Sequence, residues 1–125
     1  MSSPVLAREP GVRAHHVRLL GTGAAAPTKE FGRNITVTRP AEGRILLTWG
    51  NTHNPGTFLC ASAMFGSATP GDTKAHTVTR DTFTAQSGDT GASLEFSVWD
   101  GSAAADDLDA TEYLDIVVWF KTVNV

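Results

Sequence analysis

Alternation of apolar and polar side chains, the pattern of a strand with one buried face, recurs along this chain. It is clearest at 34–39 and 44–49, and the turn at 40–43, with its glycine, joins these two stretches into a predicted hairpin. Further strands are predicted at 15–20, 57–66, 74–85, 93–99 and 113–122, with loops at 21–27, 50–56, 67–73 and 86–91. The segment 57–66 is almost wholly apolar or small and is expected to be a central strand. The connection at 100–111 has room for one helical turn.

No stretch carries a long helical period, so the pattern predicts an all-β fold. The spacing of strands and turns is typical of a single β-sandwich or jelly roll of about seven or eight antiparallel strands. This domain is expected to span residues 15–125. Residues 1–14 contain Pro4, Pro10 and Gly11 without any period, and they predict an extended N-terminal arm that is flexible unless it docks on something.

The last predicted strand, 113–122, is apolar on both faces. One face carries Leu114, Ile116, Val118 and Phe120, and the other carries Tyr113, Val117 and Trp119, with Asp115 and Lys121 near the ends. A strand of a small monomeric sandwich needs one apolar face. The second face therefore indicates a cover, which is a neighbouring subunit, another protein or the N-terminal arm.

The three tryptophans differ in register. Trp49 shares the inward face of its strand and is expected in the core, whereas Trp99 and Trp119 lie off the inward register of their strands. Exposed aromatic side chains on a β face bind sugars or proteins. The alternative is that the opposite faces form the core. The interface interpretation is favoured.

Composition and charge narrow the class of function. A hydrophobic fraction of 41% is enough for a core, and a net charge of −3 argues against general nucleic-acid binding, which needs a basic face. The start of the chain lacks an apolar stretch fit for a signal peptide, and no run has the length of a membrane helix. The sequence thus predicts a protein made in the cytosol that binds neither nucleic acid nor membrane. Cys60, the sole cysteine, lies in an apolar run and is expected to be a buried, inert thiol.

The residues that could act in catalysis, cofactor binding or metal binding form no recognised motif. The loop 21–26 resembles a degenerate dinucleotide fingerprint, but no amphipathic helix follows it. An acidic cluster is expected to cap a helical turn and face solvent, because the glycine and spacing of a calcium loop are missing; its members are Asp106, Asp107, Asp109 and Glu112. The four histidines lack metal spacing, and His15 and His16 point to opposite faces of a strand. The sequence predicts no catalytic residue, metal or cofactor, although a triad or a carboxylate pair that meets only in the fold stays open.

Several segments resemble small virion proteins of tailed bacteriophages, namely 32–39, 43–49, 55–58, 93–100 and 105–120. The resemblance is to head decoration (cement) proteins and also to the β-sandwich tips of tail fibres, and it covers about Gly32 to Val125. It implies an oligomeric, non-enzymatic structural protein with a jelly-roll or sandwich core and without catalytic residues.

The expected function is that of a capsid decoration protein, which binds the outer surface of the phage head shell and stabilises it through protein contacts. The expected partners are the major capsid protein and further copies of the chain in a dimer or trimer, and the expected location is the head surface of the virion. The predicted contact residues are Val5, Leu6, Arg8, Val117, Trp119 and Trp99.

Two alternatives stay open. One is a receptor- or glycan-binding module of a tail fibre or head appendage, which would use Trp99 with Asn51, His53 and Asn54. The other is a small enzyme, because β-sandwich scaffolds host varied chemistry.

Overall fold

A computed structural model describes residues 11–51, 54–68, 76–100 and 104–121. This part of the chain forms eight β-strands and no helix. The strands are β1 (Val12–Leu20), β2 (Thr28–Phe31), β3 (Ile35–Thr38), β4 (Arg44–Trp49), β5 (Thr57–Ser67), β6 (Thr77–Thr84), β7 (Ser93–Trp99) and β8 (Glu112–Lys121). Among the described residues there is no helix long and apolar enough to cross a membrane.

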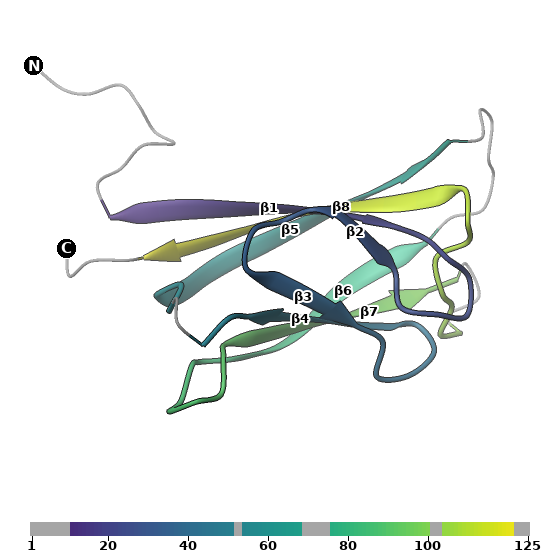
Figure 1. Cartoon of the computed structure of the whole chain (residues 1–125). Helices are drawn as coiled ribbons and strands as arrows, with labels where there is room; N and C mark the ends of the chain where they lie inside the picture. The colour runs from purple at the N-terminus through teal and green to yellow at the C-terminus, as the bar shows by residue number, and fades with distance from the viewer. Residues whose placement is uncertain (1–10, 52–53, 69–75, 101–103, 122–125) are drawn as a thin grey trace, which may run out of the picture.

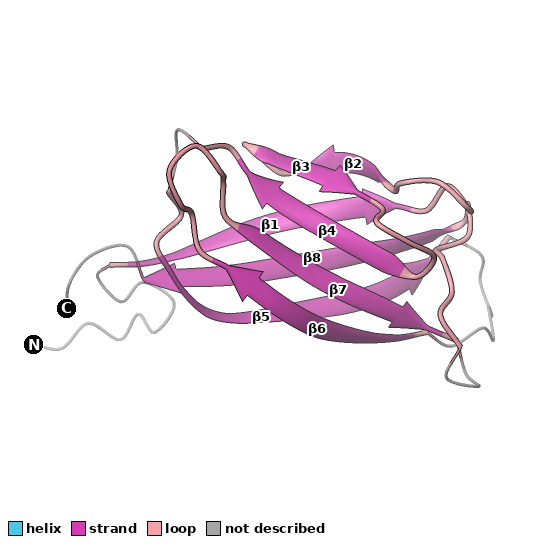
Figure 2. Ribbon diagram, turned by 90° about the horizontal axis from the view of Figure 1, so that it is seen from below, coloured by secondary structure: helices cyan, strands magenta, loops and turns pink. Residues whose placement is uncertain are grey.

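The strands form two antiparallel sheets that face each other as a sandwich (Figure 1). Sheet A has the order β2-β1-β8-β5, and sheet B has the order β3-β4-β7-β6 (Figure 2). The first and last strands pair along their whole length in the middle of sheet A, from Val12 opposite Lys121 to Leu20 opposite Tyr113. The all-β prediction and the two-sheet arrangement are therefore confirmed.

The core lies between the sheets and follows the alternation in the sequence. The inward residues of β8, which are Leu114, Ile116, Val118 and Phe120, are fully buried. Trp49 is also buried, as predicted. Because these faces form the core, the alternative with swapped registers is wrong: Trp119 lies on the outer face of sheet A, and Trp99 lies on the outer face of sheet B.

Three elements differ from the prediction. β1 begins at Val12, so the boundary expected at residue 14 lies inside a strand. The short β2 was missed because all four of its side chains are exposed and no alternation marks it. No helical turn is found in the described part of the last connection, residues 104–111.

The expectation of a central strand at 57–66 is wrong. β5 pairs with β8 alone and lies at the edge of sheet A. Its apolar residues are not buried on both faces, since Leu59 is 46% exposed and Met64 is 72% exposed. A strand that is apolar on both faces is typical of the centre of a sheet that is covered on both sides. Here the strand lies at the edge of a sheet, and its outer apolar face is uncovered.

Candidate protein interface

The outer face of sheet A, called the A face here, is the strongest candidate for a functional surface. Strand register defines it, because residues opposite one another in adjacent strands point to the same side. Trp119 lies between Ala14 and Cys60, and Val117 lies between His16 and Ser62. The A face consists of Val12, Ala14, His16, Arg18, Leu20, Thr28, Phe31, Thr57, Cys60, Ser62, Met64, Gly66, Tyr113, Asp115, Val117, Trp119 and Lys121.

The outer face of sheet B, called the B face, has a different chemistry. It is dominated by threonine and serine with one ion pair, between Arg44 and Glu95. Its members are Thr36, Thr38, Arg44, Leu46, Thr48, Thr77, Thr79, Thr84, Ser93, Glu95, Ser97 and Trp99. Hydroxyl and charged side chains keep water well, so the B face is better suited to solvent than the A face, although Ser97 is 6% exposed and donates to Asp81 Oδ2.

The exposed large hydrophobic side chains also indicate sheet A as the interaction surface. Among the described residues these are Phe31, Leu59 and Met64, and all three belong to the two edge strands of sheet A, β2 and β5. Single exposed apolar residues are common on protein surfaces, but apolar residues gathered on one face mark interaction sites. Both edges of sheet A therefore extend the apolar surface that Val117 and Trp119 begin.

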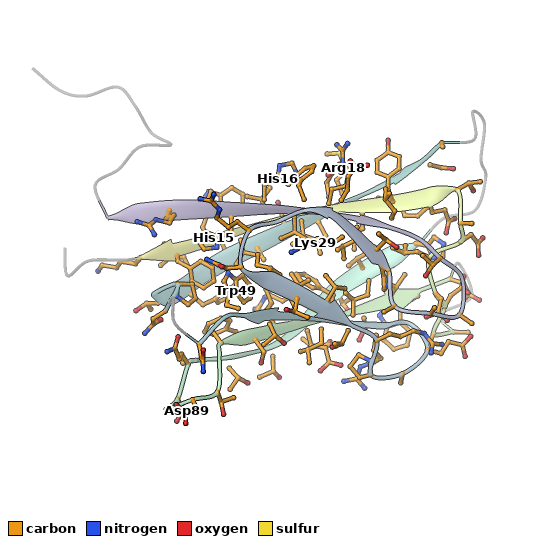
Figure 3. The ribbon with its side chains drawn as sticks, viewed as in Figure 1. His15, His16, Arg18, Lys29, Trp49 and Asp89 are labelled. Atoms are coloured by element: carbon orange, nitrogen blue, oxygen red, sulfur yellow. The ribbon has the colours of Figure 1, made fainter. Side chains whose placement is uncertain are left out.

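A polar cluster at the centre of the A face satisfies itself. Arg18 donates from Nε to Asp115 Oδ1 at 2.8 Å and from Nη2 to Oδ2 at 3.2 Å, and His16 Nε2 lies 3.1 Å from the same carboxylate. The hydrogen bonds from Arg18 hold the pKa of Asp115 below its usual value, with partial burial acting in the opposite direction. Figure 3 shows His16 and Arg18 pointing away from sheet B.

Aromatic rings pack around this cluster. The Arg18 guanidinium lies 5.5 Å from the ring centroids of both Phe31 and Tyr113, and His16 meets Phe31 edge-on at 4.7 Å. Because the charges are already paired and flanked by rings, covering this surface removes few hydrogen bonds to water. An interface with aromatic residues, arginine and paired charges is typical of protein contacts.

The structure separates the predicted contact residues. Val117 and Trp119 lie side by side on the A face, while Trp99 lies on the opposite side of the sandwich, where its indole N–H donates to Thr79 Oγ1 at 3.0 Å. Val5, Leu6 and Arg8 lie outside the described residues. The sequence did not reveal Phe31 or Met64; the signal for Met64 was present, because β5, like β8, is apolar in both registers.

Cys60 is exposed, so the prediction of a buried thiol is wrong. The register pairs it with Trp119 on the A face, after an irregularity between Phe58 and Cys60. The apolar run around it contributes to both faces of β5, and the thiol belongs to the outer one.

Two members of the acidic cluster, Asp107 and Glu112, have structural roles, which corrects the prediction of a solvated cap for them, whereas Asp109 is exposed as predicted. Asp107 receives two hydrogen bonds from Arg39, at 2.9 and 2.7 Å, and one from the Gly43 amide at 2.9 Å. Glu112 is 2% exposed and contacts His76. Among the described residues no group of histidine, cysteine and acidic side chains could hold a metal ion.

Asp107 provides a test of stability against pH. Its pKa is held below the usual value chiefly by the hydrogen bonds from Arg39, and burial opposes this in part. A carboxyl with a lowered pKa in the folded state adds stability above its unfolded pKa of about 3.9, and this contribution is lost as pH falls through the folded pKa.

Asp107→Asn should therefore destabilise the protein at neutral pH and have a smaller effect near about pH 3, because that pH lies below the unfolded pKa and the contribution of the charge has begun to decline. Urea unfolding at both pH values measures the two differences. An equal loss at both values would show that the charge of Asp107 has no part in the stability of this turn.

The residues proposed for glycan binding do not gather. Trp99 is the last residue of β7, at the end of that strand where Ser97 pairs with Arg44. Asn51 follows the opposite end of β4, beyond Thr48. Asn51 is engaged there with Asp89 and Gln86. His53 lies outside the described residues. Trp99 and Asn51 thus lie at opposite ends of sheet B and do not line one sugar site.

Comparisons of the chain with protein-family models, with curated proteins and with solved structures find no match.

Proposed function

We propose that this protein is a decoration protein of a tailed-phage head, which assembles with its own copies through the A face and binds the outer surface of the shell. The observation that carries the proposal is the contrast between the two outer faces. The A face is aromatic and apolar around a self-paired charge cluster, and the B face is rich in threonine and serine. Two copies that meet A face to A face would bury the apolar surface of both.

The finer features of the fold belong to the same proposal. A jelly roll is supported by the crossed order of strands, in which β8 lies between β1 and β5 and β7 lies between β4 and β6. In this proposal Val5, Leu6 and Arg8, which lie outside the described residues, contribute contacts to the major capsid protein. The protein acts through contacts, without catalysis, cofactor or nucleic acid.

Self-association is tested by Trp119→Asp. A carboxylate in the middle of the A face would have to be desolvated on assembly, so the association constant should fall at least tenfold, the effect of losing about 1.4 kcal/mol at a contact centre. Sedimentation velocity over a range of concentrations measures it, and circular dichroism checks the fold.

Trp99→Asp is the matched control, because it makes the same change on the B face. It should leave self-association unchanged. Unchanged assembly of Trp119→Asp, or equal weakening by the two variants, would refute the A face as the contact.

Cys60 gives a second measurement that needs no change in the core of the fold. As the sole cysteine of the chain, it reports on the A face alone. Its rate of alkylation should fall as protein concentration rises, because assembly covers the thiol. A rate independent of concentration, while sedimentation shows oligomers, would place the contact elsewhere.

The decoration role has its own test. Antibody labelling of purified virions, followed by electron microscopy, should place the protein over the head shell. Label confined to the tail would contradict this role and favour the fibre alternative, and it would leave the result on self-association intact.

A further inference from the structure

A second feature lies at the end of the sandwich where β1 begins, at the border of the A face, whose Ala14 and His16 also line it. A cavity of about 500 Å³ opens there between β1 of sheet A and the β3–β4 end of sheet B. The residues that shape its chemistry are Arg13, His15, Arg33, Asn34, Trp49 and Asn54. Its volume lies within the range of about 300–1,000 Å³ that is typical of small-molecule sites.

The cavity is positively charged in a protein whose net charge is −3. None of the described residues that line it is acidic, and two are arginines. Elsewhere in the described structure, Arg18, Arg39 and Arg44 each pair with a carboxylate. Arg80 lies over the ring of Phe58 at 4.9 Å.

Arg13 and Arg33 differ from these four. Neither has a hydrogen bond, ion pair or ring contact with any described residue. The central observation is that these two guanidinium groups, which have no partner among the described residues, line one cavity. The other described arginines pair with a carboxylate or pack on an aromatic ring.

His15 adds a hydrogen-bond donor, and the position of its ring proton follows from its contact with Trp49. The Trp49 indole N–H, which can only donate, lies 2.9 Å from His15 Nδ1, so Nδ1 accepts and the imidazole proton resides on Nε2. Burial and, secondly, the charge of Arg13 lower the pKa of His15, which favours this neutral form. Figure 3 shows His15 and Trp49 directed toward each other in the space between the sheets.

The rim of the cavity is held in place. Lys29 Nζ donates to the carbonyls of Gly32 and Ile35, at 2.7 and 2.6 Å, and so braces the turn that carries Arg33. In that turn Asn34 has a φ of 61°, and its carbonyl accepts from the Gly50 amide at 2.9 Å. A non-glycine residue in this left-handed region persists where the surrounding structure determines it.

Asn54 supplies a further donor. Its Oδ1 accepts from the Gly56 amide at 3.0 Å, and Asn54 lines the cavity, so its side-chain amino group is the donor that it offers there. The cavity thus combines two unpaired arginines, one imidazole N–H and one amide N–H, and it has no carboxylate among its described lining residues.

We propose that this cavity binds a small oxyanion, a carboxylate or a phosphate, with Arg13 and Arg33 neutralising its charge and His15 Nε2–H and the Asn54 amide donating to its oxygens. Guanidinium groups pair with both classes of oxyanion through parallel hydrogen bonds, and such charged bonds are stronger than neutral ones. This site goes beyond the proposed assembly role and does not depend on it.

The test is a titration of the full-length protein, followed by ¹H–¹⁵N NMR at low ionic strength, with inorganic phosphate in one arm and glucuronate in the other. Saturable shifts at His15, Asn34 and the Trp49 indole N–H are expected in at least one arm, and the arm that saturates identifies the class of anion. Arg33→Gln, which removes no hydrogen bond or ion pair within the described structure, should weaken binding about tenfold.

Arg44→Gln is the control, since it removes the same charge from the B face and should leave the affinity within twofold of wild type. Absence of saturable shifts in both arms would overturn the proposal. Equal weakening by Arg33→Gln and Arg44→Gln would also overturn it, because the anion would then respond to overall charge and not to the cavity.

Discussion

Replacing Glu112 by alanine is expected to lower the free energy of unfolding by about 2–3 kcal/mol, because it leaves the buried His76 side chain without its hydrogen-bond partner. Glu112 is 2% exposed, and both of its carboxylate oxygens lie near His76 Nε2, at 3.0 and 3.1 Å. Oε1 also accepts from the Asp109 amide at 2.6 Å. Its loss would leave the buried His76 Nε2 and the Asp109 amide without this acceptor, and urea denaturation measures the difference.

The size of this effect follows from the burial of the pair. The His76 side chain is fully buried, and its ring packs at 4.8 Å from Phe65, so water cannot replace the missing carboxylate. The contact joins the start of β8 to the residue just before β6, and it connects the two sheets at that end. Total stabilities of small domains are about 5–15 kcal/mol, so this loss would be a large share.

Glu95→Ala is the matched control. Glu95 pairs with Arg44 on the B face, where the arginine is 46% exposed, and a surface pair contributes up to about 1 kcal/mol. Glu112→Gln retains one oxygen for the Asp109 amide and should fall between the two. A loss from Glu112→Ala no greater than that from Glu95→Ala would contradict the role given to the buried pair.

Phe120→Ala should also be strongly destabilising, by about 3–5 kcal/mol, because it leaves a large cavity in a packed core. Phe120 is fully buried and lies at the centre of an aromatic group. Its ring centroid is 5.2 Å from that of His15, 5.3 Å from Trp49 and 5.8 Å from Phe83. These contacts come from both sheets, so the substitution weakens the packing of one sheet on the other, and thermal and urea unfolding measure it.

Phe31→Ala is the matched control for Phe120→Ala, because it removes the same ring from an exposed position. Phe31 is 39% exposed at the edge of sheet A and should cost no more than about 1 kcal/mol in the monomer, while weakening self-association. Similar losses of monomer stability from Phe120→Ala and Phe31→Ala would contradict the assignment of Phe120 to the centre of the core.

Much of the fold was accessible from alternation along single strands. The segments at 44–49 and 93–99 were predicted with the observed bounds, and the inward register of β8 was correct. Local pattern succeeds there because a strand that buries one face must alternate. It failed for β2, whose side chains are all exposed, since burial is what creates the pattern.

The candidate interface was accessible in part. Two-sided apolar character in β8 indicated Val117 and Trp119, but the neighbours that make the A face a surface, Phe31 and Met64, come from strands that are distant in sequence. The same two-sided character led to a wrong central position for β5, because a sequence does not distinguish a strand covered on both sides from an edge strand beside an uncovered apolar face.

By itself, then, the sequence determined the strand content, the inward faces and the presence of an apolar excess on the last strand, because all three depend on side chains two residues apart in one segment. The pairing of the strands decided which residues from distant segments lie together. Only the tertiary structure placed Trp99 and Trp119 on opposite sides, joined His76 to Glu112, and brought Arg13 and Arg33 to one cavity. Those relations depend on which strands are neighbours, and a local periodicity of two residues carries no information about that choice.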